Sequence, residues 1–296
     1  RYGQQAWLRI DALTELHRFA TVRGTVQRGE GIRRVRVDTS GVDALTLSLD
    51  EAPEQWQTEP MQLEVDGFTL CQGFCWETIH AARFGDSWER VEQAVQPEGK
   101  RRGSEGPVQD AYYEPMIIVR GTGRPEFAPL LRRLTQSAAQ FHDPRIDIEL
   151  PIVRDIDLTT EQIEHSHLLL WGEPSTHSPL SGILEQLPVH ARPGGVTLGE
   201  QRIDGNDLAS VVVYPNPLAP ERYLIAYSGD SAPALDSARF LPRFSPDFLV
   251  FDERIRQGVL WRRTLRGRPV RAGGFFDDAW GLSEDQSWLE PRPVNQ

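Results

Sequence analysis

Serine and histidine side chains beside apolar, strand-like runs are the first candidates for chemistry in this sequence. Ser175 and His177 follow the run "HLLLWG", and Ser228 and Ser231 lie at the end of "RYLIAYSG" and just after it. An α/β-type serine hydrolase carries its nucleophile in a G-x-S-x-G turn between a strand and a helix, and neither pair fits that pattern. A catalytic serine also needs a histidine that the fold brings to it. We expect no catalytic residue in this chain, and a cryptic hydrolase using Ser175 or Ser231 remains an alternative.

The turn "GTGRPE" (121–126) follows another apolar run and has the place of a phosphate-binding loop. A dinucleotide-binding loop reads G-x-G-x-x-G, but the third glycine position is Glu126 here. A tight turn with Pro125 at the first helical position explains the same residues. We therefore predict no cofactor.

Polar residues cluster where three expected strands end, and this placement suggests a ligand site. In an open α/β sheet the carboxyl ends of parallel strands meet at one edge and favour polar or anionic groups. Short turns and helix caps use the same residue types. If a small polar ligand binds, the expected site residues are Thr122, Arg124, Ser175, His177, Ser228 and Ser231.

Histidines and cysteines offer little for a metal. His165 and His167 alternate in "EHSHLLLW", with His142 and Asp143 as distant additional ligands, but the local pattern lacks a third ligand. We expect solvent-facing histidines at the start of a strand, and no metal site.

Cys71 and Cys75 are the only cysteines, in "CQGFC". Along an extended strand this separation spans about 13 Å, too far for a disulfide, although a turn at Gly73 would close the gap. We expect two buried thiols.

The elements that must position these residues change character along the chain. From Arg1 to about residue 100 short runs alternate polar and apolar positions, as in "RRVRVDTSGVDALTLSLDEA", and "ARFGDSWERV" indicates a hairpin around Gly85 and Asp86. This pattern is typical of an antiparallel, sandwich-like β domain. A polar, glycine-rich stretch at 96–109 then indicates a linker.

From 107 to 252 nearly continuous apolar strands alternate with helix-like segments such as 124–141 and 178–188. This alternation predicts a three-layer α/β domain with a mainly parallel sheet. "SVVVYP" and "RYLIAY" lack a helix between them, and the prolines of "YPNPLAPE" cannot donate to a ladder, so we expect an antiparallel hairpin at the sheet edge. Buried strand positions are expected at Ile117, Ile118, Val119, Leu168, Leu169, Leu170, Val211, Val212, Val213, Leu224, Ile225, Leu249 and Val250. "MIIVRG" and "HLLLWG" should run parallel.

Residues 253–296 are expected to form an extension that packs on the domains and buries Phe275, Phe276 and Trp280. Seven arginines from Arg254 to Arg271 form a basic cluster in this extension, but the chain as a whole has a net charge of -11. We therefore predict no nucleic-acid partner. No apolar run is long enough to span a membrane, and we predict no membrane partner. The chain starts at Arg1, and we expect it to be part of a longer protein.

The segments "GPVQDAYYEPMIIVRGTG", "HLLLWGEPSTHSPLSGILEQLPV", "GGVTLGEQRIDGNDLASVVVYPNPLAPERYLIAYSG" and "AGGFFDDAW" occur in this order. The order resembles the non-catalytic C-terminal region of bacterial secreted or periplasmic α/β-hydrolases of the prolyl oligopeptidase and esterase type. The resemblance implies an upstream catalytic α/β-hydrolase domain as partner and a secreted or periplasmic location. It carries over no catalytic residue, because no position here matches the family's nucleophile, aspartate or histidine. The function it implies is that of an accessory region, with a small-ligand-binding module as the alternative.

Overall fold

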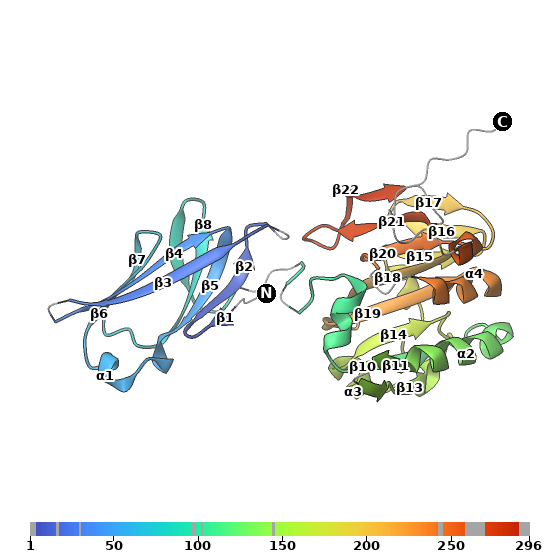
Figure 1. Cartoon of the computed structure of the whole chain (residues 1–296), viewed down its shortest axis with the longest axis horizontal. Helices are drawn as coiled ribbons and strands as arrows, with labels where there is room; N and C mark the ends of the chain where they lie inside the picture. The colour runs from blue at the N-terminus through green and yellow to red at the C-terminus, as the bar shows by residue number, and fades with distance from the viewer. Residues whose placement is uncertain are drawn as a thin grey trace. The chain divides into compact units, whose positions relative to one another are not determined.

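The computed structural model of the chain describes residues 4–15, 18–29, 31–95, 99–101, 103–143, 146–241, 245–257 and 270–289. The chain divides into two compact units, Arg1–Arg102 and Gly103–Gln296. Figure 1 shows the elements of each unit, which are described separately below.

The first unit is a β-sandwich. One sheet has the strand order β1-β2-β5-β8-β9, and the other has the order β3-β4-β6-β7. Its elements are β1 (Gln4–Gln5), β2 (Leu8–Leu13), β3 (Thr21–Arg28), β4 (Arg33–Ser40), β5 (Val42–Ser48), η1 (Leu49–Glu51), α1 (Glu54–Gln57), β6 (Met61–Val65), β7 (Phe68–Gly73), β8 (Thr78–Phe84) and β9 (Ser87–Val91).

The alternating pattern places one side of each sheet in the core of this unit. Val35 and Val37 of β4 and Leu45 and Leu47 of β5 are all buried. The chain passes from one sheet to the other at Gly41, whose φ of +69° suits glycine. The predicted β8–β9 hairpin is confirmed. The expectation of a purely antiparallel domain is wrong, because β4 pairs with β6 in parallel.

Cys71 and Cys75 form a disulfide, with Cα atoms 6.5 Å apart. Gly73 between them has a φ of +123°, a backbone conformation that bends the chain and that other residues rarely adopt. The expectation of two buried thiols is therefore wrong, and the reason is the bend at Gly73.

The second unit is built around an eight-stranded sheet with the order β13-β10-β14-β19-β18-β20-β21-β22, beside a three-stranded sheet β15-β16-β17 and the pair β11-β12. Its elements are η2 (Val108–Tyr113), β10 (Met116–Arg120), η3 (Pro125–Phe127), α2 (Ala128–Ala139), β11 (Gln140–Asp143), β12 (Ile146–Glu149), β13 (Ile152–Arg154), η4 (Asp155–Asp157), α3 (Thr160–His165), β14 (His167–Trp171), η5 (Ile183–Gln186), β15 (Val189–Arg192), β16 (Gly195–Leu198), β17 (Gln201–Asp204), β18 (Ala209–Asn216), β19 (Ala219–Gly229), α4 (Ala232–Asp236), η6 (Ser237–Phe240), β20 (Phe248–Phe251), η7 (Glu253–Gln257), β21 (Val270–Phe276) and β22 (Leu282–Leu289).

The predicted three-layer α/β domain with a mainly parallel sheet is wrong. Strands β13, β10, β14 and β19 run parallel, but β18, β20, β21 and β22 join by antiparallel pairing. The expected helix over 178–188 is reduced to the short η5, because Gly182 adopts a left-handed φ of +71°. The connection from β14 towards the β18–β19 hairpin is instead built largely from the small sheet β15–β17. Helices α2 and α4 contact one another beside the large sheet (Figure 1).

The β18–β19 hairpin forms as predicted, with the two strands antiparallel. Its predicted place at the sheet edge is wrong, because β14 and β20 flank it on either side. The prolines are tolerated there because β20 pairs with β18 only from Ala209 to Val212. Pro215 and the turn at Pro217 lie beyond that ladder, where Asn216 Oδ1 accepts a hydrogen bond from the Leu218 N–H at 3.0 Å.

The predicted sheet core is confirmed. The apolar positions expected in β10, β14, β18, β19 and β20 are all buried, and β10 and β14 run parallel. Helix α2 also forms where the spacing predicted it, with Leu131 and Leu134 buried. These strands hold the turns at their carboxyl ends in defined positions.

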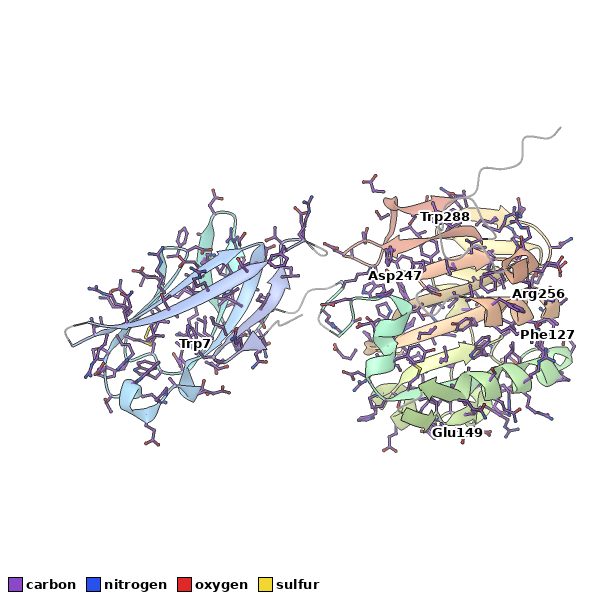
Figure 2. All side chains as sticks on the ribbon, in the orientation of Figure 1. Trp7, Phe127, Glu149, Asp247, Arg256 and Trp288 are labelled. Carbon is purple, nitrogen blue, oxygen red and sulfur yellow. A yellow bond between two sulfur atoms is a disulfide. The ribbon has the colours of Figure 1, made fainter. Side chains whose placement is uncertain are left out.

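The expected C-terminal extension contributes β21 and β22 to the large sheet. Phe276 and Trp280 are buried as predicted, but Phe275 is 39% exposed, because it alternates with Phe276 along β21. The Phe276 N–H donates to Asp247 Oδ2 at 2.9 Å, which anchors β21 to the start of β20 (Figure 2).

The described arginines of the basic cluster pair with acids. Arg254 lies 2.9 Å from Asp252 and Arg256 lies 3.2 Å from Asp236. Arg262, Arg263, Arg266 and Arg268 lie outside the described residues. In the described part of the chain, no helix has the length and apolar character needed to cross a membrane.

Candidate functional site

The turns after β10, β14 and β19 meet at one edge of the large sheet. They are joined by backbone hydrogen bonds: Gly121 N–H donates to Trp171 O at 2.9 Å, Gly123 N–H to Glu173 O at 2.9 Å, and Gly172 N–H to Tyr227 O at 2.8 Å. The predicted meeting of these strand ends is therefore present, and Thr122 lies within the first turn.

The glycines of "GTG" have a structural role in this contact. A Cβ on Gly121 would lie 2.5 Å from Glu173 O, and a Cβ on Gly123 would lie 2.5 Å from Pro174 O. Both distances are far below van der Waals contact. The space beside these glycines, which could have admitted a ligand, is therefore occupied by the backbone of the neighbouring turn.

Arg124 connects two of these turns. Its Nη1 donates to Asp230 O at 2.9 Å and its Nε donates to Glu126 at 2.9 Å. The guanidinium also lies 4.0 Å from the centroid of the Phe127 ring, a favourable cation–π geometry. Arg124 therefore ties the end of β10 to the end of β19.

The turn after β14 is organised by Asp155, a residue that the sequence did not single out. Asp155 is fully buried, and its Oδ2 accepts a hydrogen bond from the Ser175 N–H at 2.6 Å. Its carbonyl accepts one from Ser178 Oγ at 3.0 Å. The Ser175 hydroxyl accepts from the His177 N–H at 3.2 Å, so it meets the backbone of His177, whose side chain is exposed.

The two serines near the end of β19 are also engaged in the fold. Ser228 Oγ accepts from the Ala191 N–H at 2.8 Å and lies 2.9 Å from Ser210 Oγ. Ser231 caps α4 by accepting from the Ala234 N–H at 3.3 Å, and it donates to Asp207 at 2.5 Å. Among the described residues, no histidine nitrogen is a partner of the hydroxyl of Ser175, Ser228 or Ser231.

A polar hollow of about 350 Å³ lies at this edge, between the turn after β14, the η5 region, β15 and the end of β19. Of the six predicted site residues it includes only Ser228. The structure therefore brings the turns together, but it does not gather the six side chains in one cleft.

His190 is a buried residue in the lining of this pocket, and its ring is held by two hydrogen bonds. Nδ1 lies 3.0 Å from Leu187 O, and Nε2 lies 2.8 Å from Nε of Arg192. Because a carbonyl accepts and a guanidinium donates, the ring is neutral with its proton on Nδ1. Burial lowers the pKa of His190, the hydrogen bond to Leu187 opposes this, and the charge of Arg192 adds to the lowering. With Nε2 occupied, His190 positions Arg192 and is unsuited to act as a general base.

The rim of the pocket carries both signs of charge. Glu173 and Glu185 supply exposed carboxylates, and Arg192 supplies an exposed guanidinium. This arrangement can hold a small polar molecule that has a cationic and an anionic group. In the sequence the available signal is the alternation of His190 and Arg192 in "VHAR", which places both side chains on one face of a strand.

The histidines considered for a metal do not converge. His165 lies in α3 and His167 begins β14. His167 is 1% exposed, so the expectation that it faces solvent is wrong. Its Nδ1 accepts from the Tyr223 N–H at 2.8 Å, so the ring is engaged within the core beside β19. The side chains of His142 and Asp143 lie outside the described part, and within that part no group of histidine, cysteine and acidic residues could hold a metal ion.

Comparison with known proteins gave no match to a protein-family model, to a curated protein or to a solved structure. A function must therefore be inferred from the residues and geometry described above.

Proposed function

We propose that this chain is an accessory, non-catalytic region of a secreted or periplasmic hydrolase of the α/β peptidase or esterase type. In this proposal it positions, gates or supplies binding surface to a catalytic domain that precedes it in a longer protein. The resemblance of the segment order supports the type of parent protein. The single observation that carries the accessory role is that the hydroxyls of Ser175, Ser228 and Ser231 are engaged by backbone N–H groups, another serine and an aspartate, and by no imidazole of the described residues.

A serine hydroxyl is a weak nucleophile at neutral pH and needs a positioned base to remove its proton. Ser231 instead donates to Asp207 while capping α4, and Ser228 is 4% exposed. These hydroxyls stabilise the turns at the sheet edge.

The test compares the isolated chain with the chain joined to the region that precedes it. Hydrolysis of p-nitrophenyl esters and chromogenic peptides is measured for both proteins. We expect activity only in the longer protein. Turnover by the isolated chain that Ser175→Ala or Ser231→Ala abolishes would instead establish a cryptic hydrolase and overturn the proposal.

A second candidate function is binding of a small polar ligand, and the charged rim of the 350 Å³ pocket favours it. Glu173 and Glu185 would receive a cationic group, and Arg192 would receive a carboxylate. The probe is a panel of free amino acids and dipeptides, with binding followed by calorimetry. We expect Arg192→Gln to abolish binding, whereas the control Arg36→Gln, in an exposed ion pair with Asp38 of the first unit, leaves it unchanged. Equal binding by both variants would contradict this function.

A further inference from the structure

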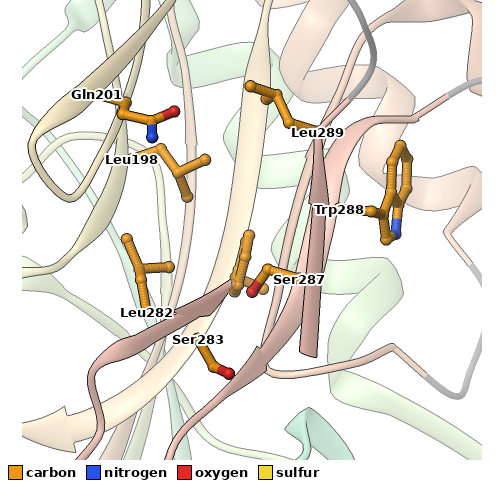
Figure 3. Close-up of a pocket in the computed structure, with 8 residues that line it drawn as sticks. Leu198, Gln201, Leu282, Ser283, Ser287, Trp288 and Leu289 are labelled. Atoms are coloured by element: carbon orange, nitrogen blue, oxygen red, sulfur yellow. The ribbon is translucent and has the colours of Figure 1, made fainter. Parts of the chain in front are cut away.

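A second hollow, of about 240 Å³, lies between the β16–β17 hairpin and β22, the last strand of the large sheet. Figure 3 shows Gln201, Leu198 and Leu282 along one side of it, with Ser287 and Leu289 on the other. It belongs to a different part of the second unit from the polar pocket and shares no lining residue with it.

The walls of this hollow are mainly apolar. Phe248 is fully buried and Leu198 is 8% exposed, while Leu289 is 47% exposed. Apolar surface that faces water is unfavourable, and covering it lowers the free energy. An apolar hollow of this size next to an exposed leucine is therefore suited to an apolar guest.

The walls are held in place by the backbone. Gly199 has a φ of +57°, and a Cβ there would lie 2.5 Å from Cδ1 of Leu282. The hairpin turn thus presses directly on Leu282. On the other side, Ser287 and Leu289 are paired with Gly274 and Ala272 of β21. The hollow is therefore formed before any ligand arrives.

One polar atom of the lining lacks a partner. The Ser287 hydroxyl oxygen is buried and has no hydrogen bond within the described part of the chain. A buried hydroxyl without a partner is unfavourable, and a ligand oxygen or N–H at this point would satisfy it. This atom is an observation independent of the apolar walls, and it specifies where the polar end of a ligand would lie.

We propose that this hollow binds a small, neutral, amphipathic molecule: an aromatic or branched alkyl group that carries one hydroxyl or carbonyl oxygen. The apolar part lies among Leu198, Phe248 and Leu282, and the oxygen hydrogen-bonds to Ser287. The ligand is neutral because none of the lining residues carries a charge. A cavity of about 150 Å³ lined by aliphatic and aromatic side chains accepts benzene, so this larger hollow has room for a ring with a substituent.

The test uses the full chain with benzyl alcohol, toluene and benzoate as probes. Binding is measured by saturation-transfer NMR and by chemical-shift titration of the backbone amide signals of the lining residues and the side-chain amide signal of Gln201. We expect benzyl alcohol and toluene to bind and benzoate not to bind. Ser287→Ala should weaken benzyl alcohol binding by about fivefold to tenfold and leave toluene binding unchanged.

A second variant tests the pocket by filling it. Leu198→Phe should abolish binding of both neutral probes, whereas Leu218→Phe, at an exposed leucine in the β18–β19 turn, should not. Near-UV circular dichroism of each variant checks that the fold persists. Absence of benzyl alcohol binding to the natural chain, equal loss with both phenylalanine variants, or an unchanged affinity in Ser287→Ala would overturn the proposal.

Discussion

Nε2 of His190 accepts a hydrogen bond from Nε of Arg192 at 2.8 Å. The two residues are two positions apart on β15, so their side chains lie on the same face of the strand. The hydrogen bond joins a buried imidazole to an exposed guanidinium and orients Arg192 at the polar pocket. A positive group this close also disfavours protonation of the ring. The two residues therefore act as a unit in which His190 must stay neutral.

The first prediction is a loss of stability in mild acid. Burial, assisted by Arg192, lowers the pKa of His190 below its ordinary value of 6.5. The unfolded chain therefore takes up a proton before the folded chain does, so the free energy of unfolding falls as the pH drops below about 6.5. His190→Gln should reduce this pH dependence, measured by urea unfolding at pH 7.5 and 5.5. His167, whose pKa is lowered mainly by burial, leaves a remaining dependence. The exposed His177→Gln is the control, and an identical pH dependence in His190→Gln and the natural chain would contradict the prediction.

Asp236 is predicted to stabilise the side of the second unit that carries α2 and α4. Its carboxylate is 12% exposed and lies within 3.3 Å of Arg133, Arg239 and Arg256. Asp236→Asn should lower the free energy of unfolding by about 2 kcal/mol, because charge-assisted hydrogen bonds from several donors are lost. Chemical denaturation measures the effect. Asp204→Asn, in an exposed pair, should change stability by under about 1 kcal/mol, and equal effects of the two variants would refute the assignment.

Asp66 is predicted to be the corresponding, partly buried, anchor of the β-sandwich. It accepts hydrogen bonds from the Thr39 N–H and hydroxyl, from Arg83 and from Trp88, at distances of 2.6 to 2.9 Å. Burial alone would raise the pKa of Asp66, but the hydrogen bonds from Thr39 and Trp88 and the charge of Arg83 lower it. The stability it supplies is therefore present above its unfolded pKa near 3.8 and is lost as the pH falls through the lower folded value.

The experiment follows tryptophan fluorescence of Asp66→Ala and the natural chain during acid titration. The variant should be less stable at pH 7 by about 2 kcal/mol, and the difference should narrow towards pH 3. The exposed Asp38→Ala serves as the control. A constant difference across the whole range would show that the ionised carboxylate of Asp66 does not supply the stability, since its left-handed φ of +47° makes alanine unfavourable there at every pH.

Gly123 is predicted to be required for folding at the sheet edge. In Gly123→Ala the new Cβ would meet Pro174 O at 2.5 Å, so the turns after β10 and β14 must separate. We expect a loss of about 1 to 3 kcal/mol in the free energy of unfolding, measured by thermal and urea denaturation. Thr122→Ala, in the same turn, should be close to neutral. A Gly123→Ala chain of normal stability would reopen the possibility that this glycine serves a ligand.

Local patterns predicted the elements of this protein better than their arrangement. The apolar runs at Ile117–Val119 and Leu168–Leu170 are buried strands, because a β-branched or leucine-rich run of this length suits a doubly covered strand. The β18–β19 pairing followed from the absence of a crossover segment between the runs. The helix expected over 178–188 failed at Gly182, since its left-handed backbone interrupts the apolar spacing.

In the candidate site, too, the sequence indicated the positions of residues but not their partners. Sequence position alone indicated that Thr122, Ser175 and Ser231 lie in turns at the ends of strands. It could not show that Asp155 binds the Ser175 N–H or that Asp207 accepts from Ser231, because each partner is distant along the chain. His190 and Arg192 were overlooked for a related reason: β15 becomes part of a pocket only when it packs beside the end of β19.

The sequence by itself determined which segments are extended and apolar, that Gly85 and Asp86 turn a hairpin, and that the serines lack a nucleophile motif. These properties depend on neighbouring residues and on side-chain periodicity. Tertiary structure alone decided that the proline-bearing hairpin lies inside the sheet, that the chain past residue 252 adds strands to it, and which hydroxyls are occupied. Strand order and hydrogen-bond partners depend on contacts between distant segments, and the local pattern of a β-strand is compatible with many neighbours.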